Sequence, residues 1–172
     1  DAEQKENGRR RQAERREKIT QMTLLISQEE YQDADALLGD SSLGLPSLEG
    51  ANVLRTLGEW RARNGHWHAA AKRFNALLQV DQLDGWDTIT LDYLECGPVF
   101  IEVNDLDGYE RFRQAAVARF AGMTNPASDR IVKICLLRPA GADLIQSLQP
   151  LAKTTLQTFQ ASQTGPLPDH FR

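Results

Sequence analysis

Apolar residues recur every three or four positions along most of the chain, and short polar or Gly- and Pro-containing stretches interrupt them. From about residue 15 the pattern forms four units of two helical segments each, at about 15–40, 51–84, 90–122 and 126–162. In the last three units the two segments are predicted to be separated at residues 64–65, 104–108 and 139–141. No stretch shows the sustained two-residue alternation of a half-buried strand, and the nearest, residues 88–91, is short. We therefore predict an all-α fold of stacked antiparallel helical hairpins, with the array over residues 27–165.

The two ends of the chain differ from the middle. Residues 1–26 are rich in helix-forming Glu, Gln, Arg, Lys and Ala, and predict a long charged helix that runs into the first hairpin. Its basic residues alternate with glutamates, which favours a solvated face over a lipid or nucleic-acid site. Ser27 with Glu30 predicts a capping box for the next helix. Residues 40–50 predict a loop, and residues 163–172 a terminal loop that leads into further sequence.

A small-residue pattern recurs in register across three units. The aligned positions Leu54, Tyr93 and Ile131 differ by 39 and 38 residues, a spacing typical of stacked helical hairpins. Small residues at fixed offsets let helices cross closely, and large ones fill the grooves between hairpins. The predicted repeat positions are Leu54, Leu57, Gly58, Trp67, Ala70, Phe74, Tyr93, Cys96, Gly97, Phe100, Ile131, Ile134 and Cys135.

These segments resemble a known repeat family. LRTLGEWRARNGHW (54–67), CGPVFIEVNDLDGYERF (96–112) and RIVKICLLRP (130–139) resemble irregular tetratricopeptide (TPR) arrays found C-terminal to serine/threonine protein kinase domains of planctomycetes and verrucomicrobia. The chain departs from the motif at Arg61, where an aromatic residue is expected, and its repeats exceed the usual length of ~34 residues. The resemblance implies a TPR-like α-solenoid with a right-handed superhelix. It also implies a place in a larger bacterial signalling protein, in which a charged linker like residues 1–18 follows a kinase and a membrane span.

The family's register implies a concave groove lined by the first helix of each hairpin. Transferred to this chain, the groove contains Asn52, Arg55, Glu59, Arg63, Leu91, Leu94, Ile101, Val132 and Leu136. Such a groove is polar at one end and apolar at the other, and it suits an acidic or phosphorylated peptide with an apolar end. The alternatives are that neighbouring repeats cover the apolar positions and that Glu59 pairs with both arginines.

Several motifs have a structural and a functional interpretation. His66 and His68 could form a metal site, but we favour the interpretation that they are surface residues beside a buried Trp67. His170 has no identifiable partner for a metal or catalytic site. Asp105 and Asp107 have the spacing of calcium-loop ligands but lack the closing glutamate, so we expect helix capping. Cys96 and Cys135 are expected to be core residues rather than nucleophiles. Trp60 and Trp86 lie off the repeat positions, and each is either an exposed contact residue or partly buried at a repeat junction.

Composition narrows the classes of function. The 172 residues are 41% hydrophobic and 26% charged, with a net charge of -4, which disfavours general nucleic-acid binding. No apolar run of about 18 residues could span a bilayer, so we expect no membrane insertion of this segment and a cytoplasmic location. Glycine-rich nucleotide loops and kinase catalytic triplets are missing from the sequence. We therefore expect no enzymatic activity and no cofactor. The leading hypothesis is a protein-interaction scaffold; an architectural spacer and an unrecognised enzyme are the alternatives.

Overall fold

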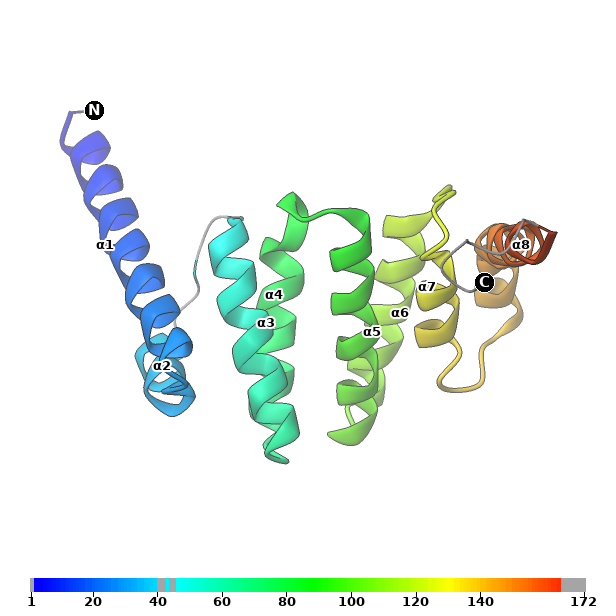
Figure 1. Ribbon diagram of the computed structural model, residues 1–172, viewed down its shortest axis with the longest axis horizontal. Helices are drawn as coiled ribbons and strands as arrows, with labels where there is room; N and C mark the ends of the chain where they lie inside the picture. The colour runs from blue at the N-terminus through cyan, green and yellow to red at the C-terminus, as the bar shows by residue number, and fades with distance from the viewer. Residues whose placement is uncertain (1, 40–42, 44–45, 165–172) are drawn as a thin grey trace, which may run out of the picture. The chain divides into compact units, whose positions relative to one another are not determined.

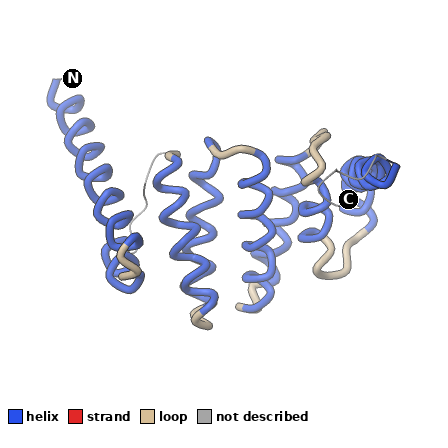
Figure 2. The backbone as a smooth tube through the Cα atoms, viewed as in Figure 1, coloured by secondary structure: helices blue, strands red, loops and turns tan. Residues whose placement is uncertain are grey.

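Helices make up most of the described structure. The computed structural model describes residues 2–39, 43 and 46–164, and among these Figure 2 shows helices and loops without a strand. The all-α prediction is confirmed. None of the described helices combines the length and the apolar character needed to cross a membrane.

The chain divides into two compact units, Asp1–Asp84 and Gly85–Arg172. The first unit contains α1 (Ala2–Ser27), α2 (Tyr31–Leu38), α3 (Leu48–Arg63) and α4 (Trp67–Val80), which Figure 1 labels, and the short 3-10 helix η1 (Asp81–Leu83). The second unit contains α5 (Trp86–Glu102), α6 (Leu106–Phe120), α7 (Ser128–Cys135) and α8 (Ala142–Thr164). Helices that follow each other in a unit pack together, as the hairpin pattern predicts.

Helix α1 is the long charged helix that the sequence predicts, but the predicted cap at Ser27 is not found. Side chains 3–17 of α1 are exposed, whereas Met22 is fully buried where α2 packs against α1. The predicted capping box is wrong, because α1 continues to Ser27 and the Ser27 hydroxyl donates to the carbonyl of Leu24 at 2.6 Å. The chain turns after it through Glu29 (φ 62°), and Glu30 precedes α2 without a side-chain cap.

The hairpin of α3 and α4 begins earlier than predicted. Ser47 caps α3 by accepting the N–H of Gly50 at 3.0 Å, so the helix includes residues assigned to the loop; residues 40–42 and 44–45 of that loop lie outside the described residues. The break at Asn64 and Gly65 is confirmed, with Gly65 at a positive φ of 74° that glycine tolerates.

The second unit also consists of packed helices, and the ends of some of them again differ from the prediction. Asp105 caps α6 and Gly108 lies inside that helix, which shortens the predicted turn of residues 104–108. The break predicted at residues 139–141 is confirmed, because α7 ends before it and α8 begins after it. Helix α7 packs against α5, α6 and α8. Helix α8 continues to Thr164, beyond the predicted start of the terminal loop, and residues 165–172 are not among the described ones.

The predicted repeat positions form much of the core. All of them are buried except Trp67, which is half-buried at the start of α4. A Cβ on Gly58 would lie 3.1 Å from the ring of Phe74, and one on Gly97 would lie 3.3 Å from the ring of Phe112 and 3.4 Å from the Cβ of Ile134. These glycines therefore sit where helices cross closely, as the small-residue pattern predicts.

Candidate functional site

The polar part of the predicted groove lies on α3, and its arginines are engaged within the first unit. Arg55 donates to Asp84 at 2.9 Å and to Asn52 at 2.5 Å, and 16% of its side chain is exposed. Arg63 pairs with Glu59 at 2.9 Å, as in the alternative in which Glu59 pairs with the arginines of this helix. A ligand that used Arg55 would have to compete with Asp84.

The apolar part of the predicted groove lies in the second unit. Leu91 on α5 and Leu136, just after α7, are exposed, whereas Leu94, Ile101 and Val132 are half-buried. Each unit thus presents some of the residues assigned to the groove at its own surface. A continuous groove through both parts stays a prediction.

The two tryptophans differ in their surroundings. Trp60 is half-buried and stacks on Tyr31 with ring centroids 6.1 Å apart, and the Arg61 guanidinium lies 4.7 Å from the Trp60 ring. Trp86 is 51% exposed and contacts Phe120 edge-on at 5.7 Å. Trp60 is therefore a packing residue of the first unit, and Trp86 is available for contact.

The candidate metal ligands occupy separate positions. His66 and His68 are exposed at the start of α4, beside the half-buried Trp67. Asp105 caps α6 by accepting the N–H of Gly108 at 2.8 Å, as expected for a capping residue. No group of three or more His, Cys, Asp or Glu side chains in the described part of the chain is arranged to hold a metal ion, and His170 lies outside that part.

Both cysteines are buried, as predicted for core residues. Burial raises the pKa of the Cys135 thiol to about 12, with only partial opposition from the Arg113 charge. The thiolate is the reactive form of cysteine, so Cys135 is inert near neutral pH while the second unit is folded.

A buried carboxylate with two arginines is the main feature that the sequence analysis missed. Asp35 on α2 is 4% exposed and accepts hydrogen bonds from Nε of Arg61 at 3.0 Å and from Nε of Arg73 at 2.8 Å. Arg73 also donates to the carbonyl of Gly39 at 2.7 Å. Burial acts to raise the pKa of Asp35, but the hydrogen bonds from Arg73 and Arg61 outweigh it and the pKa is lowered. This Asp35 cluster joins the first hairpin to the second.

A second polar cluster holds the end of α7 in the other unit. The Tyr109 hydroxyl donates to the carbonyl of Ile134 at 2.6 Å, and Arg113 donates to the carbonyl of Pro139 at 3.1 Å. Arg113 also pairs with Glu110. Carbonyls at a helix end need donors when they are buried, so α6 supplies donors at the end of α7 in addition to the Leu136 N–H, which bonds to the carbonyl of Lys133.

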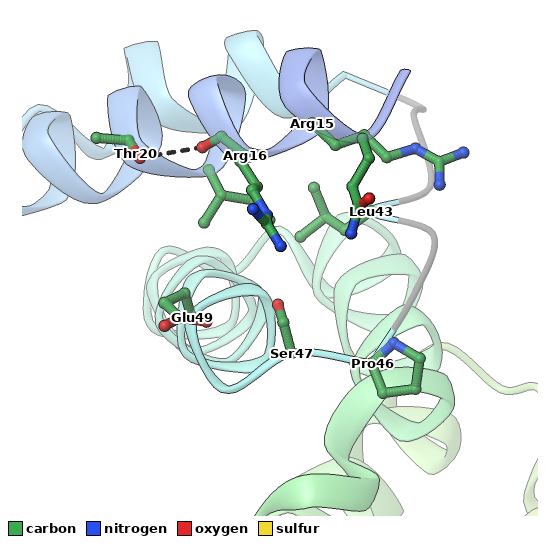
Figure 3. A pocket seen from close by; sticks show the side chains of 9 residues that line it. Arg15, Arg16, Thr20, Leu43, Pro46, Ser47 and Glu49 are labelled. Carbon is green, nitrogen blue, oxygen red and sulfur yellow. Dashed lines mark hydrogen bonds between the residues drawn. The ribbon is translucent and has the colours of Figure 1, made fainter. Parts of the chain in front are cut away.

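The larger described pocket lies between α1 and the start of α3 (Figure 3), with a volume of about 510 Å³. Gly50 lies beside it: a Cβ at Gly50 would lie 2.8 Å from the Ser47 hydroxyl oxygen, and at van der Waals distance, 3.6 and 3.8 Å, from methyls of Leu43 and Ile19. The lining residues are Gln12, Arg15, Arg16, Ile19, Thr20, Leu43, Pro46, Ser47 and Glu49. Sequence analysis assigned none of them to a site.

The pocket combines apolar walls with positive charge. Ile19 and Leu43 contribute apolar surface, and in Figure 3 the Arg16 side chain reaches from α1 into the space above Ser47. Among the described residues neither Arg15 nor Arg16 has an ion-pair partner. The sequence analysis predicted only a solvated face for this part of α1, because the alternation of arginine and glutamate does not show which arginines form ion pairs. Glu49 is the acidic residue of the lining.

A smaller pocket of about 420 Å³ lies in the second unit. Trp86 on α5 and Arg119 and Phe120 at the end of α6 form it together with residues 121–125. The Arg119 guanidinium lies over the Tyr93 and Phe120 rings, 5.4 and 5.7 Å from their centroids. This arginine is thus occupied in packing against aromatic rings.

Comparisons of the chain with protein-family models, with curated proteins and with solved structures found no match.

Proposed function

We propose that this chain is a non-enzymatic interaction scaffold that holds an acidic segment of a partner protein. The observation that carries the proposal is the pocket between α1 and α3, where two arginines with no ion-pair partner among the described residues lie beside the apolar side chains of Ile19 and Leu43. A site of this composition suits a peptide in which a carboxylate or phosphate stands next to an apolar residue.

The physical basis is the chemistry of the guanidinium group. Its planar fork donates two parallel hydrogen bonds to a carboxylate or phosphate, and such charge-assisted bonds are stronger than neutral ones. The start of α3 adds partial positive charge from its helix dipole, next to Ser47. Glu49 opposes an acidic group at its own side, so the acidic group is expected on the α1 side, where Arg16 reaches into the pocket (Figure 3).

The wider context rests on the sequence. Stacked helical hairpins expose extended surfaces for binding, and the resemblance to kinase-associated TPR arrays supports a right-handed TPR superhelix. On the same basis we propose a regulatory or recruiting role, in the cytoplasm, within a larger bacterial signalling protein. The buried small residues Gly58 and Gly97 at helix crossings support the repeat register.

Fluorescence anisotropy with labelled short peptides tests the proposal. The probes alternate glutamate with leucine, and matched probes carry glutamine in place of glutamate. The parent should bind the glutamate peptide better, and the preference should weaken as salt rises, because salt screens exposed charges. Loss of a charged hydrogen bond costs ~1.5–3 kcal/mol, so Arg15→Ala with Arg16→Ala should weaken binding at least about tenfold.

The control removes equal charge from the same helix. Arg9 and Arg11 are exposed on α1 and outside the pocket lining, so Arg9→Ala with Arg11→Ala should leave binding close to that of the parent. Equal losses in both double variants would show general attraction to a basic helix and contradict the pocket. Binding to neither peptide would instead favour an architectural spacer.

A further inference from the structure

Around α1 the basic and acidic residues are separated, although they alternate along the sequence. The helix is continuous, so each residue is rotated by about 100° from the one before it. Placed in this way, four residues fall within an arc of about 60°, here called the α1 stripe: Lys5, Arg9, Gln12 and Arg16. The glutamates of the exposed part of α1 fall about 90–170° from the centre of this arc: Glu3, Glu6, Glu14 and Glu17.

The α1 stripe begins in the pocket between α1 and α3. Gln12 and Arg16 are in the pocket lining, and Figure 3 shows the Arg16 side chain reaching into the pocket. Arg9 and Lys5 continue the same face towards the N-terminus, about 10 and 16 Å from Arg16 at ~1.5 Å per residue. Both side chains are exposed, and neither has an ion-pair partner among the described residues. Two further cations therefore lie in line with the pocket.

The charge of the whole chain favours a short acidic partner over an extended polyanion. Residues 1–18 contain seven of the 20 basic and five of the 24 acidic residues, so the rest of the chain has a net charge of -6. A nucleic acid or an anionic bilayer presents many charges over a wide surface, and the acidic remainder of the chain would repel it. A protein segment of limited length can contact the α1 stripe alone.

We propose that the acidic partner segment continues beyond the pocket along the α1 stripe, where further carboxylates contact Arg9 and Lys5. This inference rests on the proposed function, because the pocket anchors the segment. A span of about 16 Å corresponds to about five residues of extended chain at ~3.3 Å each. The partner is therefore an acidic tract of about five residues next to the apolar residue that the pocket holds.

Fluorescence anisotropy with peptides of two lengths tests the proposal on the full chain. The short probe is the glutamate–leucine peptide that fits the pocket, and the long probes add five glutamates or five glutamines to one end of it, with each end tried in turn. Two exposed ion pairs are weak contacts, so the glutamate extension at the favoured end should tighten binding to the parent only about fivefold. The glutamine extension should leave the affinity unchanged.

Two double variants place the contact on the α1 stripe. Lys5→Ala with Arg9→Ala should abolish the gain from the glutamate extension and leave binding of the short probe unchanged. The matched control is Arg10→Ala with Arg11→Ala, which removes the same charge from positions about 130° from the centre of the α1 stripe. This control should keep the gain. Alanine favours helix at all four positions, so α1 is retained in both variants.

The outcomes separate this proposal from the proposed function. A glutamate extension without any gain in the parent, or with equal gains in the parent and the Lys5→Ala, Arg9→Ala variant, would overturn the proposal and leave the pocket as a site. Failure of the short probe to bind the parent would contradict the proposed function. Tighter binding of a single-stranded oligonucleotide or of phosphatidylserine vesicles than of the long probe, lost in the same variant, would show that the partner is not a protein segment.

Discussion

Removal of the Asp35 carboxylate is the sharpest test of how the first unit is held together. Asp35 on α2 receives hydrogen bonds from Arg61 on α3 and Arg73 on α4, so one carboxylate connects two hairpins. Asp35→Ala leaves both guanidinium groups without this acceptor. We expect the free energy of unfolding of the first unit to fall by about 3 kcal/mol.

The structure sets this magnitude. Removal of one partner of a buried ion pair typically costs ~3–5 kcal/mol, because the remaining charge is left without compensation. Here the side chains of Arg61 and Arg73 keep 24% and 12% of their surface exposed, so water can partly replace the lost carboxylate. The lower end of the range is therefore expected, in spite of several charged hydrogen bonds.

The effect should also depend on pH in a defined direction. The pKa of Asp35 is lowered in the folded protein, because hydrogen bonds from Arg73 and Arg61 outweigh burial, which acts to raise it. The ionised carboxylate thus stabilises the fold fully above its unfolded pKa of about 3.9, and this contribution is lost as pH falls through the lower folded-state pKa. The difference between parent and Asp35→Ala should be constant near neutral pH and shrink below about pH 4.

Urea unfolding, followed by circular dichroism and by tryptophan fluorescence, measures the change. Trp60 adjoins Arg61 and reports on this region. The matched control is Asp33→Ala, which removes an exposed carboxylate from the same helix and should cost within about 0.5 kcal/mol. Equal stabilities of the two variants, or a difference between Asp35→Ala and the parent that grows in acid, would refute this account of the cluster.

Other predictions concern helix crossings and the thiols. Gly97→Leu should lower the free energy of unfolding by about 3 kcal/mol, because an added Cβ alone would lie 3.3 Å from the Phe112 ring and overpacking costs ~1–3 kcal/mol. Ala70→Leu should destabilise the fold in the same way. The control is Gly8→Leu, which adds a side chain in open space and should not lower the melting temperature. A Gly97→Leu melt equal to the parent's would show that the crossing is misplaced. The Cys135 thiol should resist alkylation at pH 8 until denaturant is added, because burial raises its pKa to about 12, and rapid labelling of the native protein would contradict this.

The helical fold and the positions of close packing follow from local sequence. Apolar spacing near 3.6 residues defines the helices, and the glycine and proline breaks define most turns. Gly58 and Gly97 were identifiable because a close crossing requires a missing side chain wherever it occurs. Helix ends were less accurate: Ser47 and Ser27 are equally suitable caps by residue type, but only Ser47 precedes its helix and accepts the N–H of Gly50.

The polar contacts were decided by the tertiary structure. Arg61 stands where the motif expects an aromatic residue, which marks the position as unusual, yet its partner Asp35 is 26 residues away in another hairpin. The pocket of Arg15 and Arg16 likewise depends on the meeting of α1 with the start of α3. The sequence alone determined which residues favour helix and which must be small, because these are local steric properties. Which charges pair, and which face a cavity, depends on distances that exist only once the helices have packed.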